Sequence, residues 1–182
     1  MLDIFDISDV QIVHGWVYDR HSKDSDIILQ HGQNYDHATQ IIAEGDSLDA
    51  ILPNSSSSSN NFELNEHDQN VVKNARVLAN FINNSRTQMT ITGLFALSDT
   101  LPDRTYVALF RNSHLSVLYK RNNKLYSLVS DGALAEESDV IWETLEDVDG
   151  SGSSFLNSEF RPSGTIGLVF FNTKFYIIDY ND

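Results

Sequence analysis

Hydrophobic residues recur at helical spacing in the first 100 residues of the chain. The clearest helix is predicted over residues 66–83, where apolar side chains three and four positions apart share one face. Residues 35–44 predict a shorter amphipathic helix that Gly45 would end. Residues 90–97 predict a third helix, capped by one of its two threonines.

Beyond Pro102 the spacing of hydrophobic residues changes to that of strands. The continuous apolar run 106–110 predicts a strand that is covered on both faces. Further apolar runs around polar turns predict two β-hairpins. Their strands are residues 114–119 with 125–129, and residues 165–171 with 175–180. Helices that precede antiparallel strands favour an α+β fold over alternating βαβ units.

A polar segment interrupts the helical region. Pro53 and Asn54 are followed by five serines and two asparagines, and such a sequence has too little apolar area to pack. We therefore expect a flexible surface insertion at about residues 53–62. The 182 residues otherwise fit one globular domain, which can bury roughly 70% of the surface of its unfolded chain without disulfides or metals.

The chain is strongly acidic, with 12 Lys and Arg against 26 Asp and Glu and a net charge of -14. This charge disfavours nucleic acids as partners, because affinity for them comes mainly from Lys and Arg. It favours encounter with a basic protein surface, although most acidic proteins are simply soluble. No apolar run approaches the roughly 20 residues of a membrane helix, and the acidic N-terminus does not resemble a signal peptide. We therefore expect a cytoplasmic or nuclear protein without membrane contacts.

The sequence contains no cysteine. This excludes disulfides, thiolate metal sites and a cysteine nucleophile within the chain. The histidines of the first 40 residues match no zinc-binding pattern, and surface positions are their simplest interpretation. The run Asp147-Val148-Asp149-Gly150 resembles the start of a calcium loop, but Ser158 stands where the required glutamate would be. We expect no metal and no cofactor.

His114 is the strongest candidate for chemistry. It is predicted at the first residue of a strand, after the apolar strand 106–110 and the polar turn Asn112-Ser113. Rigid backbone would hold its ring at an open edge of the sheet, which suits a general base. The alternative is a half-buried histidine with a satisfied hydrogen bond.

Several separated stretches resemble, in order, the MINDY family of deubiquitinases. The longest is VALFRNSHLSVLYKRNNKLYSL at residues 107–128. A stretch that contains His14-Gly15-Trp16 is similar to the family's His-Gly-Trp segment, and residues 90–97 also fit. We assign residues 1–160 to the C-terminal part of a MINDY-type domain of a fungal-type member, and leave 161–182 unassigned as C-terminal strands or a tail.

The resemblance implies a papain-like cysteine-protease variant fold and hydrolysis of polyubiquitin linked through lysine 48. It implies that His114 is the catalytic histidine, which takes a proton from a cysteine thiol so that the thiolate attacks the isopeptide carbonyl. Trp16, Tyr35 and Phe110 fall where the family places aromatic side chains that hold ubiquitin and its C-terminal tail. Core positions are the alternative for Trp16 and Phe110. Arginines in and around ubiquitin's tail would complement the charge of -14.

The family's nucleophilic cysteine lies N-terminal to the His-Gly-Trp segment, close to which this sequence begins. We therefore expect an incomplete domain that lacks its N-terminal lobe and exposes apolar surface. It would be inactive alone, because loss of a nucleophile costs on the order of a million-fold in turnover. Three explanations stay open, namely a C-terminal fragment of an enzyme, a truncated reading frame, or a noncatalytic ubiquitin-binding relative.

Overall fold

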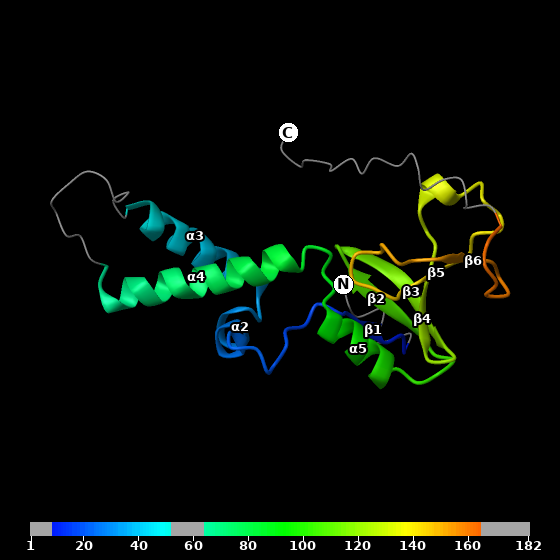
Figure 1. Ribbon diagram of the computed structural model, residues 1–182, viewed down its shortest axis with the longest axis horizontal. Coiled ribbons are helices and arrows are strands. Elements are labelled where there is room, and N and C mark those ends of the chain that lie inside the picture. Colours follow the sequence, from blue (N-terminus) through cyan, green and yellow to red (C-terminus); the bar gives the residue numbers. More distant parts are fainter. Residues whose placement is uncertain (1–8, 52–63, 165–182) are drawn as a thin grey trace. The chain divides into compact units, whose positions relative to one another are not determined.

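The computed structural model describes residues 9–51 and 64–164, which belong to two compact units (Figure 1). The helical unit is Gly15–Gly93, and the sheet unit combines Met1–His14 with Leu94–Asp182. The predicted insertion and the second predicted hairpin lie outside the described residues. Each unit is described by itself.

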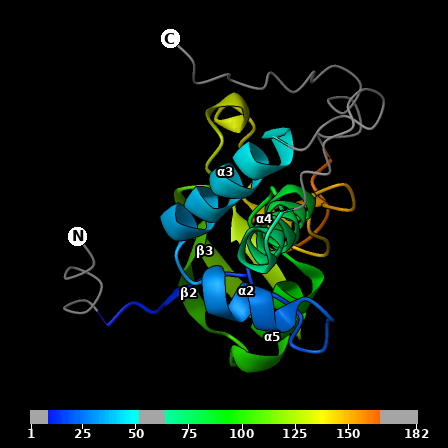
Figure 2. The same cartoon turned by 90° about the vertical axis from the view of Figure 1, so that its left-hand side faces the viewer.

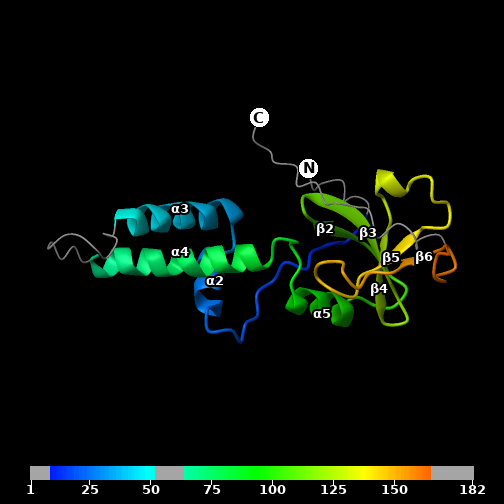
Figure 3. The same ribbon diagram turned by 45° about the horizontal axis from the view of Figure 1, so that its top comes forward.

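Three helices are the main elements of the helical unit as far as it is described. They are α2 (Ser25–His31), α3 (Tyr35–Ile51) and α4 (Glu66–Asn84). α3 runs alongside α4, and α2 packs on a different side of α4 (Figures 2 and 3). α4 buries Val72, Ala75 and Leu78, which confirms the helix predicted over residues 66–83. No helix in the described parts of the chain is long and apolar enough to cross a membrane.

Gly45 does not end a helix, so this prediction from the sequence is wrong. α3 continues through Gly45 to Ile51. A Cβ atom at Gly45 would lie 2.2 Å from the Cβ atom of Ala75 on α4. The absence of a side chain therefore allows two helices to approach closely, and the conformational freedom of glycine is not used here.

α5 (Ile91–Thr100) confirms the third predicted helix. Thr90 caps it, because its Oγ1 accepts the backbone N–H of Gly93 at 3.0 Å. The backbone N–H of Thr90 donates to the carbonyl oxygen of Gly15 at 3.0 Å, and Gly15 forms a β-bridge with Met89. A Cβ atom at Gly93 would lie 1.8 Å from the same carbonyl oxygen. The first and last residues of the helical unit therefore lie in contact.

The sheet unit is built on a six-stranded sheet with strand order β1-β2-β3-β4-β5-β6 in its described part. β1 runs parallel to β2, and the other neighbours are antiparallel. The strands are β1 (Ile12–Val13), β2 (Tyr106–Arg111), β3 (His114–Arg121), β4 (Lys124–Leu128), β5 (Trp142–Thr144) and β6 (Phe155–Leu156), and the short 3-10 helix η1 (Gly132–Leu134) follows β4. β3 and β4 confirm the first predicted hairpin, and helices with an antiparallel sheet confirm the α+β class.

One face of the sheet is buried against α5 (Figures 1 and 3). Val107 and Leu118 on this face are 3% and 0% exposed. Lys120 shares the face and is also buried, and its ammonium donates to the carbonyl oxygens of Ser98 and Leu101 at the end of α5. A lysine at this place supplies donors to carbonyls that lack partners within the helix and lies at the negative end of the helix dipole.

The opposite face of the sheet is open along β2 and part of β3. Tyr106, Phe110 and Val117 on that face are 60%, 44% and 38% exposed. The prediction that residues 106–110 are covered on both faces is therefore wrong for the described part of the chain. An apolar run does not reveal whether a second layer of structure covers it.

An aromatic cluster covers the rest of this face. Phe160 stacks on Trp142 with ring centroids 5.2 Å apart and lies edge-on to Tyr126 at 4.9 Å. Tyr106 and Tyr119, stacked with ring centroids 4.1 Å apart, extend the cluster to the open part of the face. Aromatic pairs in these geometries stabilise a core beyond the area that they bury.

Lys120→Met is expected to lower the free energy of unfolding by about 1–3 kcal/mol, because it keeps the aliphatic stem but leaves two carbonyls at the end of α5 without their donor. Lys124→Met is the matched control, since Lys124 is exposed and forms a surface ion pair with Glu146. Urea unfolding measures both. Equal losses of stability in the two variants would contradict the role of Lys120.

Candidate functional site

His114 is the first residue of β3 and is exposed to solvent. It follows a two-residue turn in which Asn112 and Ser113 have φ angles of 51° and 59°. Turns with two positive φ angles connect antiparallel strands well, because their twist matches that of the strands. The hairpin therefore fixes the backbone of His114 and leaves its ring accessible, at the strand start expected from the sequence.

The imidazole of His114 has a hydroxyl neighbour that the sequence analysis missed. Its Nε2 lies 3.4 Å from Oγ of Ser130. Ser130 lies two residues beyond the end of β4 (Lys124–Leu128), so it reaches the ring from the segment after the strand and not from the paired part of the hairpin. A hydroxyl in this place can orient the ring and select which nitrogen carries the proton.

Arg111 pairs with His114 across the hairpin and connects it to the loop that follows β5. Its Nη2 donates to the carbonyl oxygen of Val148 at 2.7 Å. Burial lowers the pKa of the Arg111 guanidinium, and nearby carboxylates, with Glu143 foremost, oppose that shift. The guanidinium stays protonated at neutral pH, so a permanent positive charge stands across the hairpin from His114.

The acidic loop at Asp147 uses its carboxylates internally. Asp147 accepts the backbone N–H of Gly150 at 2.5 Å and that of Gly152 through its other oxygen. The backbone N–H of Ser151 donates to Asp149 and lowers the pKa of that carboxyl. These bonds define a polar turn. Among the residues that the structure describes, no group of three or more His, Cys, Asp or Glu is placed to hold a metal ion.

The side chains of Phe110 and His114 lie on opposite faces of the sheet. Phe110 pairs with Leu115, whereas Arg111 pairs with His114, and successive side chains alternate between the faces of a sheet. Phe110 is exposed, so the alternative of a core position is wrong for the described part of the chain. Beside it lies a shallow apolar depression of about 410 Å³, whose lining includes Val10, Tyr106, Ala108, Leu115 and Val117.

Trp16 and Tyr35 lie next to each other in the helical unit, with ring centroids 6.2 Å apart. Phe81 of α4 stacks nearly parallel to the indole of Trp16 at 6.0 Å. The indole Nε1 donates to Oγ of Ser85 at 2.7 Å. Trp16 is half-buried and Tyr35 is exposed. The structure thus brings two predicted aromatic residues together and adds Phe81 and Ser85, which the sequence analysis missed.

The four predicted site residues are divided between the two units. Trp16 and Tyr35 belong to the helical unit, and Phe110 and His114 belong to the sheet unit. The aromatic pair and the histidine hairpin are therefore treated as separate features.

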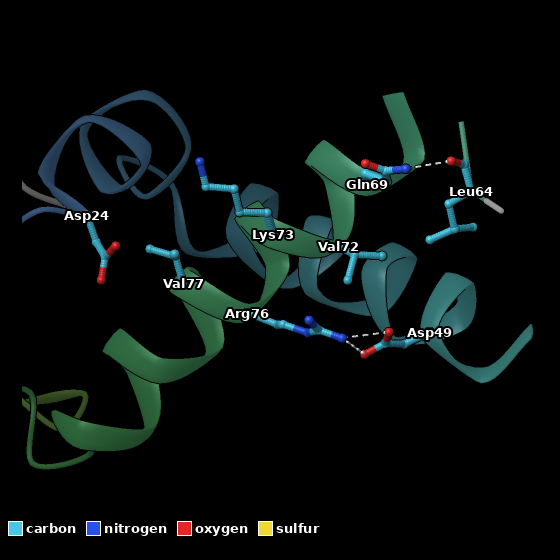
Figure 4. Close-up of a pocket in the computed structure, with 8 residues that line it drawn as sticks. All are labelled: Asp24, Asp49, Leu64, Gln69, Val72, Lys73, Arg76 and Val77. Carbon is cyan, nitrogen blue, oxygen red and sulfur yellow. Dashed lines mark hydrogen bonds and ion pairs between the residues drawn. The ribbon is translucent and has the colours of Figure 1, made fainter. Parts of the chain in front are cut away.

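A groove with a charged rim lies among the helices of the helical unit (Figure 4). Its volume is about 470 Å³, and Val72 and Val77 contribute apolar surface to its wall. Nη2 of Arg76 donates to both carboxylate oxygens of Asp49, at 2.8 Å and 2.7 Å (Figure 4). The residues that line this groove include none of the four predicted site residues. Its ion pair fastens α3 to α4, and we assign no chemistry to it.

Comparison with known proteins identifies the family of this chain. The model of the MINDY deubiquitinases matches residues 1–160. The chain therefore belongs to the MINDY deubiquitinase family, and the resemblance inferred from the separated motifs is confirmed.

Individual relatives are similar over most of the chain. Uncharacterized protein YGL082W of Saccharomyces cerevisiae is 33% identical over 162 residues, which are 89% of this chain and 40% of that protein. Ubiquitin carboxyl-terminal hydrolase MIY1 of the same yeast is 31% identical over 91% of this chain and 43% of that protein. Human ubiquitin carboxyl-terminal hydrolase MINDY-2 is 34% identical over 87% of this chain and 22% of that protein. The chain thus spans less than half the length of these relatives.

Ser113→Gly is expected to raise the free energy of unfolding by about 0.5–1 kcal/mol, because glycine adopts the φ of 59° without a steric penalty. Ser113→Val is expected to lower it by about 1–2 kcal/mol, since a β-branched residue is strained at positive φ. Urea unfolding gives both values. If the serine, glycine and valine proteins were equally stable, the turn that presents His114 would not have this geometry.

Proposed function

We propose that this chain is the histidine-bearing, ubiquitin-recognising part of a MINDY-type cysteine deubiquitinase that hydrolyses lysine-48-linked polyubiquitin. The observation that carries the proposal is the family match over residues 1–160, which includes the exposed His114 at the start of β3. Two relatives that match 91% and 87% of the chain are named ubiquitin carboxyl-terminal hydrolases. By itself the chain has no hydrolase activity in this proposal, since its sequence contains no cysteine.

His114 acts as the general base of the proposed reaction. Its imidazole takes the proton of a cysteine thiol supplied from outside these 182 residues, and the thiolate attacks the isopeptide carbonyl carbon. The imidazolium then gives its proton to the leaving lysine amine as the C–N bond breaks. Water hydrolyses the resulting thioester and releases the C-terminus of ubiquitin. Ser130, 3.4 Å from Nε2, orients the ring during these transfers.

Two aromatic features recognise ubiquitin in this proposal. Trp16 and Tyr35 offer a large and rigid contact area to the C-terminal tail. Phe110 and the apolar depression beside it offer a second contact surface. Exposed aromatic side chains are enriched in protein interfaces, and the charge of -14 favours approach of a basic partner.

A noncatalytic ubiquitin-binding module is the second candidate. The absence of cysteine from all 182 residues favours it, because a cysteine protease needs a thiol. The aromatic residues would then keep their role, and His114 would have none. We prefer the enzyme because the match covers 43% of MIY1, so a protein of that length has room for the thiol elsewhere.

Trp16→Ala and Phe110→Ala are each expected to weaken ubiquitin binding about tenfold or more, because truncation of a central aromatic residue typically costs about 2 kcal/mol. Phe95→Ala is the matched control, since Phe95 is 64% exposed on α5 and lies outside the proposed site. Titration of labelled ubiquitin measures each affinity. If Trp16→Ala bound ubiquitin as tightly as the unchanged chain, Trp16 would not belong to the site.

A hybrid protein separates the two candidate functions. It joins a cysteine-bearing N-terminal segment of a MINDY relative to this chain and is tested for cleavage of lysine-48-linked tetra-ubiquitin. We expect cleavage, a loss of about a thousandfold or more in turnover for His114→Ala, and a loss of about three- to tenfold for Ser130→Ala. A folded hybrid that binds ubiquitin without cutting it would favour the noncatalytic module.

A further inference from the structure

The indole of Trp16 is held by the C-terminal end of α4. Its Nε1 donates to Oγ of Ser85 at 2.7 Å, although the two residues are 69 positions apart in the sequence. Phe81, one helical turn before Ser85, stacks on the indole with ring planes 11° apart. The same turn of α4 therefore contacts both the N–H group and the apolar surface of the indole.

The hydroxyl of Ser85 has one arrangement of hydrogen bonds available. Ser85 is 5% exposed, and its Oγ lies 2.5 Å from the carbonyl oxygen of Phe81 as well as next to the indole. An indole N–H only donates and a carbonyl oxygen only accepts. The hydroxyl must therefore donate to Phe81 and accept from Trp16, so both of its roles are occupied.

The backbone around Trp16 is fixed by a second segment of the chain. The carbonyl oxygen of Gly15 accepts the backbone N–H of Thr90 at 3.0 Å, and that of Val17 accepts the Thr90 hydroxyl at 2.6 Å. Both neighbours of Trp16 are thus bound to one residue. Tyr35 lies next to this immobilised tryptophan and is 56% exposed, so it stays accessible to a ligand.

We propose that Ser85 is a positioning residue of the ubiquitin-binding site, because its hydroxyl fixes the indole of Trp16 beside Tyr35 before ubiquitin arrives. The inference rests on the proposed function and adds a residue that does not itself touch ubiquitin. An indole that is free to rotate loses conformational entropy when a ligand immobilises it, whereas a fixed indole has lost that entropy during folding. The hydrogen bond therefore increases affinity without an additional contact.

Ser85→Ala and Trp16→Phe remove this hydrogen bond from its two ends. Each is expected to weaken ubiquitin binding about three- to tenfold, because one hydrogen bond is lost while an aromatic ring stays in place. The double variant is expected to bind no more weakly than Trp16→Phe alone, since the hydrogen bond to Ser85 is already absent there. Ser85→Thr keeps the hydroxyl and is expected to bind ubiquitin as tightly as the unchanged chain does.

The indole N–H resonances provide a readout that a general loss of stability would not reproduce. The chain has 2 tryptophans, so Trp142 serves as an internal reference for Trp16. Ser85→Ala is expected to shift the Trp16 resonance and speed its exchange with solvent, and to leave that of Trp142 unchanged. Ser47→Ala is the matched control, because Ser47 donates to the carbonyl oxygen of Ala43 at 2.8 Å in the same helical geometry. It is expected to bind ubiquitin as the unchanged chain does.

The outcomes separate this inference from the proposed function. Unchanged affinity in Trp16→Phe, together with a loss in Trp16→Ala, would overturn the role of Ser85 and leave the ubiquitin site intact. Unchanged affinity in Trp16→Ala would overturn the site itself. If Ser85→Ala does not fold, unchanged affinity in Trp16→Phe would still overturn the role of Ser85, because this variant leaves the Ser85 hydroxyl bonded to Phe81.

Discussion

Backbone pairing between β2 and β3 determines where the functional candidates of the sheet unit lie. Arg111 pairs with His114 and Phe110 with Leu115, so the side chains of His114 and of the exposed Phe110 project from opposite faces of the sheet. The alternation that continues along β3 places Lys120 on the face of His114, where its ammonium reaches the end of α5. A shift of one residue would exchange the two faces. The core contact and the presentation of His114 therefore depend on the same register.

Periodic segments of the sequence predicted their elements well. The apolar positions of α4 and the alternating residues around the β3–β4 turn gave the correct type and nearly the correct bounds. β5 and β6 were not predicted, because strands of three and two residues contain too few positions for a period. Gly45 was misread as a helix end, since a sequence does not reveal that Ala75 of another helix lies 2.2 Å from its missing Cβ atom.

The candidate site was predictable where a motif carried it and not where only folding brings residues together. His114, Trp16, Tyr35 and Phe110 were inferred from the family resemblance, and the structure adds their surroundings. Ser130 was not predicted, because it lies beyond the end of β4, where the register of the hairpin no longer determines where a side chain points. Ser85 was not predicted either, since no local pattern links a serine at a helix end to an indole 69 residues away.

The contact between Gly15 and Gly93 has a consequence for how the chain can vary. The backbone N–H of Thr90 donates to the carbonyl oxygen of Gly15, and Gly93 lies against the same oxygen. The first and last residues of the helical unit are therefore adjacent in space. Insertions are tolerated when they leave the flanking backbone undisturbed. Residues added in the connections between the helices of this unit would leave the separation of β1 and β2 unchanged. We therefore expect relatives to differ in the number of residues between these two glycines.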